Sequence, residues 1–303
     1  MKMMMKGSKF LMVCAIFCVF LTAKGQNTDL ARLEYTYFPQ SSSDNSFRRF
    51  RTSIAFPIEL KEGTYLMPGL EYRNVNFEYE DPAAFQTYDL DRFQSFTFSL
   101  GYTFQMNEFW RFGAEGGVKI ASNFTLDKAI NDDFIYTGAL IFVKIKEDER
   151  YYKPTRLILG LRYSTTTGFP FPLPIINYYR RWNKNWSYMA GSPKSNLKYY
   201  FNEKNAVEAF VTLDGFFANI QEDFNVAPLR PGSDKIARSI SMTVLLSGVG
   251  YEHSFTDHLK FYLYAGNTIL NDIRFRDNKK NSIYTINDKN SIYARSGLKF
   301  SIF

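Results

Sequence analysis

Large apolar residues alternate with small or polar residues over long stretches of this chain. From Ser95 to Gln105 every even position is large and apolar, and every odd position is small or polar. The same period of two recurs over residues 50–60, 110–120 and 156–164. A β-strand places successive side chains on opposite faces, whereas a helix repeats every 3.6 residues. The pattern therefore predicts an all-β protein built from amphipathic strands.

The lengths of the strands and of their connections favour a barrel. Strands of ten or more residues exceed the five or six that are usual in soluble sheets and approach the roughly 9–11 that cross a bilayer. A soluble β-sandwich also has one buried and one wet face. Here, however, short links such as 106–108 and 183–185 interleave with long ones such as 80–91 and 220–236. Short turns on one rim and long loops on the other are typical of an antiparallel transmembrane β-barrel, which we predict.

The number of strands must be even. Backbone polar groups cannot stay unpaired in hydrocarbon, so the sheet closes, and single-chain bacterial barrels close with an even count. Residues 186–201 lie between two short turns and contribute either two crossings, bent at Gly191-Ser192-Pro193, or none. We predict twelve strands, with fourteen as the alternative. The twelve lie near residues 30–38, 48–60, 65–79, 93–105, 110–122, 134–145, 155–165, 174–182, 206–219, 237–254, 259–271 and 290–303.

The amino-terminal residues have the pattern of an export signal. Three lysines precede an apolar run over residues 10–21, and the small residues Ala23 and Gly25 follow it. Twelve apolar residues rise only about 18 Å as a helix, too little for a hydrocarbon core of roughly 30 Å. We therefore predict a cleaved signal peptide over 1–25, a single barrel domain over 26–303, and export through the inner membrane to the cell outer membrane.

Removal of this leader takes away both cysteines and several positive charges, which excludes some kinds of site and partner for the mature chain. Both cysteines, Cys14 and Cys18, lie inside it, which excludes disulfides, thiolate metal sites and cysteine nucleophiles from the mature protein. The leader's four lysines also carry four of the seven net positive charges of the chain, which argues against a nucleic-acid partner. We expect outer-membrane lipid and the barrel-insertion machinery as partners, and the oligomeric state stays open.

Aromatic residues make up 18% of the chain, and all three tryptophans abut short turns. Trp110 follows one turn, while Trp182 and Trp186 bracket another. An indole ring suits the membrane interface, where its N–H meets water and its ring meets lipid. These tryptophans are the candidates for an interfacial girdle.

Two segments carry a resemblance to a known family. They are Pro174-Ile175-Ile176-Asn177-Tyr178, before the tryptophan-flanked turn, and the stretch from Gly191 to Asn202 after it. With the leader and the alternating strands, the chain resembles the functionally uncharacterised outer-membrane β-barrel proteins common in Bacteroidota, a domain of unknown function. The resemblance implies the fold and the location over essentially the whole mature chain, and it implies no catalytic residues.

The alternation also directs charged side chains to the face opposite the apolar one. Facing lipid, each would cost roughly 2–4 kcal/mol near the midplane, so they belong in the lumen. We favour a cross-lumen network that fills the barrel over a narrow, slightly anion-favouring pore, because twelve strands fall between filled and open barrels. The lumen-facing candidates are Arg51, Arg111, Glu115, Lys119 and Arg162, with Arg49, Glu59, Arg156 and Glu208 on the same face.

Catalytic chemistry finds little support. The two histidines, His253 and His258, flank one turn. His253 and Ser254 are adjacent on a strand and point to opposite faces, so they cannot pair as base and nucleophile. We predict no metal site, no cofactor and no catalytic set. The hypotheses that remain are a small-solute pore or surface-binding barrel, a lipid-modifying or hydrolytic barrel centred on a histidine, and a structural or partner-binding barrel.

Overall fold

The computed structural model describes residues 29–39, 46–79, 85, 87–147, 150–226 and 235–301. The predicted signal peptide, residues 1–25, lies outside them. The strands are β1 (Asp29–Pro39), β2 (Ser46–Ala55), β3 (Ile58–Lys61), β4 (Thr64–Glu78), β5 (Arg92–Gln105), β6 (Trp110–Ser122), β7 (Phe134–Lys146), β8 (Lys153–Ser164), β9 (Phe171–Arg181), β10 (Trp186–Ser192), β11 (Lys194–Tyr200), β12 (Asn205–Asn225), β13 (Ile236–Ser254), β14 (Leu259–Arg276), β15 (Ser282–Asn287) and β16 (Ile292–Ser301). Two single-turn helices, η1 (Asn131–Asp133) and η2 (Thr165–Thr167), accompany them. Among the described residues no helix is long and apolar enough to cross a membrane.

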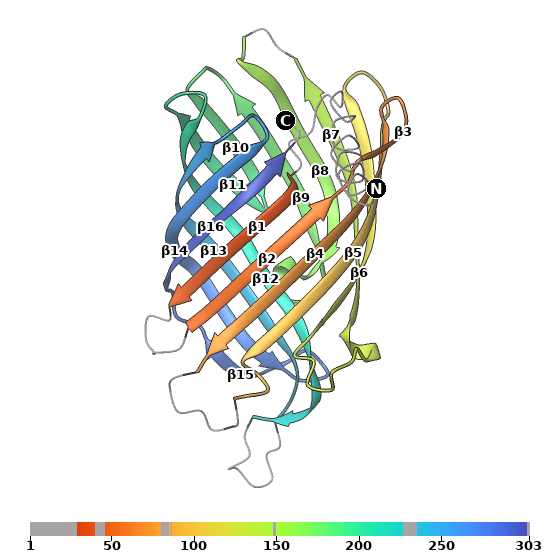
Figure 1. The fold of residues 1–303 in the computed structure, drawn as a ribbon, viewed down its shortest axis with the longest axis vertical. Helices are drawn as coiled ribbons and strands as arrows, with labels where there is room; N and C mark the ends of the chain where they lie inside the picture. The colour runs from red at the N-terminus through yellow and green to blue at the C-terminus, as the bar shows by residue number, and fades with distance from the viewer. Residues whose placement is uncertain are drawn as a thin grey trace, which may run out of the picture.

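These strands form one closed antiparallel barrel (Figure 1). Neighbours in sequence pair with each other, and β1 closes the sheet against β16. β3 pairs only with β4, and β15 pairs only with the far half of β14, so neither adds a position around the barrel. Fourteen strands remain. The all-β barrel predicted from the alternation is confirmed.

The preferred count of twelve strands is wrong, and fourteen, the alternative, is confirmed. Residues 186–201 contribute β10 and β11, which have seven residues each. At the bend between them Gly191 has a φ of 139°, and a Cβ there would lie 1.7 Å from the carbonyl oxygen of Ile176. Only glycine fits this close approach. The strands were hard to recognise because they are shorter than the usual crossing length.

The apolar faces of the strands point outward and are uncovered. On β5, Phe96, Phe98 and Leu100 are 50%, 53% and 44% exposed, whereas a sandwich would bury them against a second sheet. From Phe96 to Phe104 a strand tilted by about 40° rises roughly 20 Å, comparable with the about 25 Å apolar band of membrane barrels. We call this band the apolar belt; it also includes Ile54, Leu70, Leu140, Leu161, Ile176, Val211, Val249 and Leu263.

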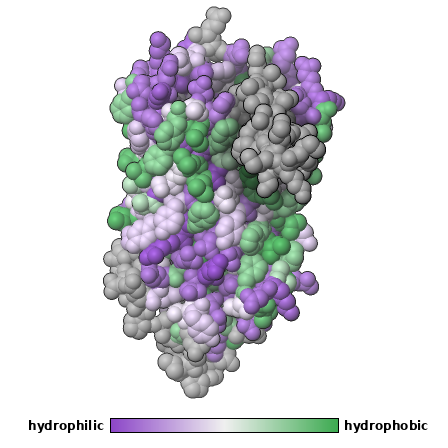
Figure 2. All heavy atoms as spheres, viewed as in Figure 1, coloured by the Kyte–Doolittle hydropathy of each residue, from purple (hydrophilic) through white to green (hydrophobic). Residues whose placement is uncertain are grey.

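Beyond the apolar belt the alternation reverses its phase. Nearer the long loops, β5 turns the polar Arg92 and Gln94 outward and buries Phe93, which is 1% exposed. On β4, Val75 and Phe77 are likewise buried while their neighbours are polar. Figure 2 shows this division on one face: apolar residues gather in the upper half, below a hydrophilic rim, and polar residues spread over the lower half. The far ends of these strands are therefore suited to water outside and an apolar core inside.

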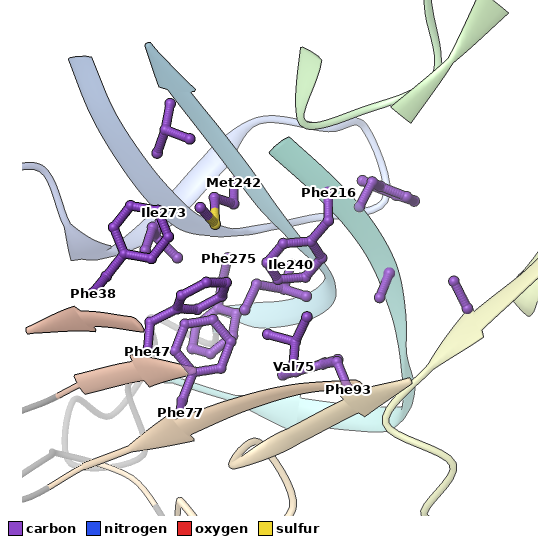
Figure 3. Packing of buried hydrophobic residues seen from close by; sticks show 14 of the residues in the cluster. Phe38, Phe47, Val75, Phe77, Phe93, Phe216, Ile240, Met242, Ile273 and Phe275 are labelled. Carbon is purple, nitrogen blue, oxygen red and sulfur yellow. The ribbon is translucent and has the colours of Figure 1, made fainter. Parts of the chain in front are cut away.

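That inner core, here called the cap core, fills the barrel at the long-loop end. The Phe47 ring lies 5.3 Å from that of Phe77 and 6.1 Å from that of Phe216 on the opposite side (Figure 3). Aromatic rings at such distances pack favourably beyond their burial alone. The cap core comprises mainly Phe38, Phe47, Val75, Phe77, Phe93, Phe216, Ile240, Met242, Ile273 and Phe275.

The long-loop halves of β12 and β13 cross the lumen to complete this core. We call residues 213–225 and 236–246 the cap hairpin. Phe216, Phe217 and Ala218 are all at most 4% exposed, so both faces of β12 are covered there. Asn219 pairs in parallel with Ser122 of β6, a strand that is not its neighbour around the barrel. The cap hairpin thus reaches the far wall and closes the long-loop end.

Replacing Phe98 with arginine tests whether the apolar belt faces lipid. In a bilayer this change should lower the free energy of unfolding by about 2–4 kcal/mol, because a charge near the midplane is desolvated. Urea titration of the protein in lipid vesicles measures it. The matched variant Tyr88→Arg alters a loop residue that is 66% exposed and should change stability by less than about 0.5 kcal/mol. Equal effects at the two positions would show that Phe98 faces water.

Candidate functional site

One side of the lumen is filled by a buried ion-pair network. Arg49 of β2 donates through Nη1 and Nη2 to the two carboxylate oxygens of Asp214 on β12, at 3.0 and 2.6 Å. Arg295 of β16 donates to the same carboxylate at 2.6 Å. Glu34 of β1 lies 3.6 Å from the Arg49 guanidinium and 3.8 Å from that of Arg295. We call these four residues the lumen network; they bind the cap hairpin to the barrel wall.

A second set of ion pairs continues along β11, β12, β13 and β16. Lys198 lies 2.7 Å from Glu252 and 3.8 Å from Glu208. Lys194 contacts Glu208 at 2.6 Å, and Lys299 contacts Glu252 at 2.7 Å. Each carboxylate is thus matched by two ammonium groups. Together the two sets leave this half of the lumen packed.

The rest of the lumen, lined mainly by β2 and by β4 to β9, encloses a chamber instead. It consists of two adjoining cavities of about 230 Å³ and about 470 Å³. They share lining residues, including Gly69, Ser99, Glu115 and Arg162, so they form one space. Glycine, alanine, serine and threonine line much of it. Because their side chains are small, they leave this part of the lumen unfilled.

Charged groups concentrate in the smaller cavity, which lies next to the cap hairpin on the long-loop side of the chamber. Arg51 and Arg73 both donate to Glu71, at 2.5 and 2.6 Å. Lys119 is buried and donates to the Thr165 hydroxyl at 2.9 Å and to the Phe217 carbonyl at 3.1 Å. It therefore connects β6 to η2 and to the cap hairpin, which together close the chamber at its long-loop end.

Arg162 and Arg156 are the two arginines of the chamber whose buried Nε has no hydrogen-bond partner, and Arg162 is the one that reaches both cavities. Within the described part of the chain, no carboxylate lies within ion-pair distance of it. Glu115 lies two strands away, with Ala139 between them in register, a separation of about 10 Å between backbones. Arg162 thus presents an unpaired guanidinium to the chamber.

The structure brings together four of the five predicted lumen candidates. Arg51, Glu115, Lys119 and Arg162 all line the smaller cavity. Arg111 does not line the chamber: it donates to the Gly63 carbonyl at 3.0 Å, near the β3–β4 turn. Of the further inward charges, Arg49 and Glu208 belong to the packed half, Arg156 lines the larger cavity, and Glu59 is exposed on β3.

Sequence reasoning missed Glu71 and Arg73, two charged chamber residues that pair with each other. Their signal was present in the alternation, since Leu70 and Tyr72 occupy the apolar positions of the same strand. The shared carboxylate could not be foreseen, because it depends on the register that sets Arg51 opposite Arg73.

The tryptophans lie beside the short turns. The rings of Trp182 and Trp186 are stacked at 6.3 Å with an interplanar angle of 2°. Lys144 lies 5.4 Å above the ring of Trp110. A cation over an indole at this distance is an attractive contact.

The histidines are held by structural contacts. His253 Nδ1 lies 2.8 Å from the amide oxygen of Asn205, and His258 Nδ1 lies 3.0 Å from the carbonyl oxygen of Ser301. Neither residue lines the chamber. Within the described ranges, no group of three His, Cys, Asp or Glu side chains is placed to hold a metal ion.

Comparisons with known proteins find one family model and several solved structures of low sequence identity. A family model described as a domain of unknown function, DUF6268, matches residues 32–301. No curated protein sequence matches the chain. Among solved structures, the KdgM porin is 10% identical, with 89% of this chain and 98% of that one covered and a TM-score of 0.36. LpxR from Salmonella typhimurium is 6% identical, with 89% and 99% covered and a TM-score of 0.39. The P. putida toluene transporter TodX is 9% identical, with 90% of each chain covered and a TM-score of 0.36. These likenesses concern the fold alone.

Proposed function

The chain belongs to the DUF6268 family of domains of unknown function, and from its lumen we propose that it is an outer-membrane binding barrel. In this proposal the chamber takes up a small solute, and the cap core closes the barrel at the long-loop end. The observation that carries it is the unequal filling of the lumen. One half is packed with matched ion pairs, while the other keeps an open chamber with an unpaired arginine.

The chamber extends toward the short-turn rim. Its larger cavity is lined by Thr103, two residues before the end of β5, and by Gly113, three residues after the start of β6. At the other end the chamber stops beneath Thr165 of η2 and the cap hairpin, to which Lys119 is bound. A solute therefore enters from the short-turn side, which faces the periplasm in a barrel of this kind.

Single cysteines test the direction of access, because no described residue is a cysteine. Ser99→Cys places a thiol in the chamber, Tyr88→Cys in a long loop and Glu203→Cys in a short turn. We expect a membrane-impermeant thiol reagent to label Tyr88→Cys on intact cells. Glu203→Cys and Ser99→Cys should react only after the outer membrane is permeabilised.

Two measurements keep this test decisive. Heat-modifiable electrophoretic mobility confirms that each variant is folded, and planar-bilayer recording should show no steady conductance for the parent protein. Labelling of Ser99→Cys on intact cells at the rate of Tyr88→Cys would contradict the proposal and favour an open pore.

We also propose the cellular setting of this barrel. Residues 1–25 serve as a cleaved signal peptide, and the insertion machinery places the mature chain in the outer membrane of a member of the Bacteroidota. Trp110, Trp182 and Trp186 then lie at the interface on the periplasmic side. The stacked rings of Trp182 and Trp186 beside a short turn support this placement.

A further inference from the structure

We propose that the ligand of the chamber is a small single-chain amphiphilic acid, with an apolar body and one carboxylate or phosphate head. This inference rests on the proposed function and names the class of solute that the chamber takes. It follows from a division within the chamber, whose two ends have different chemistry.

The end beneath the cap hairpin is rich in cations. Arg51, Arg73, Lys119 and Arg162 line the smaller cavity, against the carboxylates of Glu71 and Glu115. A third carboxylate in the lining, Asp29, is already paired with Arg32. Four cationic side chains therefore line this cavity against two carboxylates that are not paired elsewhere in the described chain, Glu71 and Glu115. Glu71 is shared by two of the arginines. This end favours a negatively charged group.

Arg162 is the residue placed to receive that group. A guanidinium binds a carboxylate or phosphate with two parallel hydrogen bonds, a geometry that ammonium groups cannot match. A guanidinium with no carboxylate partner is costly where its N–H groups are buried, and in the packed half of the lumen Arg49 and Arg295 both pair with Asp214. The hydroxyls of Thr137, Ser164 and Thr166 line the same cavity and supply neutral donors. An oxyanion at this point would satisfy the Nε that now has no partner.

The end nearer the short turns is largely apolar apart from Arg156, whose guanidinium lies 5.5 Å from the centroid of the Tyr179 ring. Met67, Ile141, Val143, Ile158, Leu173 and Ile175 line the larger cavity. Alternation turns their side chains inward, opposite the apolar belt, where a purely aqueous channel would carry polar groups. Cavities of this combined size suit ligands of modest mass with an apolar body and a few polar anchors. The cavity volumes of about 230 and 470 Å³ accommodate one short chain rather than a two-chain lipid.

Protection of the Ser99→Cys thiol from labelling, in phosphatidylcholine nanodiscs, measures binding. The probes are decanoate, 1-decanol with the same chain and no charge, and inorganic phosphate with the charge and no chain. We expect decanoate to protect at concentrations at least tenfold lower than either of the others. Adding Arg162→Gln should weaken decanoate by about 10- to 100-fold, the loss of a hydrogen bond to a charged group, and leave decanol unchanged.

Further variants separate the two ends of the chamber. Ile158→Asn should weaken decanoate and decanol alike, Arg162→Lys should restore part of the decanoate affinity, and Arg48→Gln, outside the lumen, should change nothing. Equal protection by decanoate and decanol, or an unchanged decanoate affinity in Arg162→Gln, would overturn the inference. Protection by phosphatidylglycerol nanodiscs without decanoate would also overturn it, since the head group would then come from a two-chain lipid.

The failure of this inference differs from failure of the proposed function. If Ser99→Cys is reached only from the short-turn side and none of the probes protects it, the binding barrel stands and the amphiphilic acid is wrong. If Ser99→Cys is labelled on intact cells, the proposed function itself is wrong.

Discussion

Replacing Asp214 with alanine is expected to lower the free energy of unfolding by about 3–5 kcal/mol, one of the largest losses that a single substitution in this chain can cause. The carboxylate accepts hydrogen bonds from Arg49 and Arg295, whose side chains are 2% and 10% exposed. Removing it leaves the two buried guanidinium groups with Glu34 as their remaining carboxylate, which is too distant from either for a short hydrogen bond, and within the described chain Arg295 keeps only its bond to the Thr36 hydroxyl. Urea unfolding of the protein in lipid vesicles, followed by tryptophan fluorescence, measures the change.

An exposed ion pair gives the matched control. Glu78 of β4 pairs with Arg48 on the outer face of β2, and both side chains are about half exposed, at 46% and 45%. Glu78→Ala should therefore cost less than about 1 kcal/mol. If Asp214→Ala costs no more than Glu78→Ala, the lumen network does not hold the cap hairpin in place.

The sequence predicts the crossing strands well because alternation in a membrane barrel is enforced twice. Lipid excludes charges from one face, and the lumen accepts them on the other. The predicted strand over 110–122 has the same bounds as β6, and the orientation of Arg51, Lys119 and Arg162 followed from counting by two. These are local consequences of backbone geometry, so they need no tertiary information.

The cap core was not predicted because it requires contacts between distant strands. The prediction ended β12 near residue 219 and treated 220–236 as a loop, whereas the strand continues to Asn225 and crosses the lumen. The reversal of alternation was visible in the sequence, with Phe93 between the polar Arg92 and Gln94. Its meaning depends on knowing where the bilayer ends, which a period of two does not reveal.

The chamber could not be located from the sequence for the same reason, because it depends on contacts between distant strands. Counting by two places Arg49 and Arg162 on one inner face and makes them equivalent. The structure separates them: Arg49 meets the carboxylate that the cap hairpin brings across the lumen, and Arg162 meets open space. Whether a buried charge serves stability or binding thus depends on what the opposite wall presents to it, and that is decided by the path of the cap hairpin.

Shortening the cap hairpin is expected to turn the closed barrel into a conducting one. Phe216 and Met242 lie directly opposite each other in register, so an Asn-Gly turn can join them in place of residues 217–241. This variant loses the Phe217 carbonyl that Lys119 binds and removes Ile240 from the cap core. With most of the cap hairpin gone from the long-loop end of the chamber, planar-bilayer recording should show discrete conductance steps where the parent shows none.

A second shortened loop controls for the effect of deleting a loop and inserting a new turn. Arg276 and Ser282 are also opposite in register, so an Asn-Gly turn can replace residues 277–281 at the tip of the β14–β15 hairpin. That variant keeps the cap hairpin and should stay silent. Both variants must first show the heat-modifiable mobility of a folded barrel. If a folded barrel without residues 217–241 still passes no current, then the ion pairs of the lumen and the remaining cap core close the lumen without the cap hairpin. The cap hairpin would then be a support for the chamber rather than its gate.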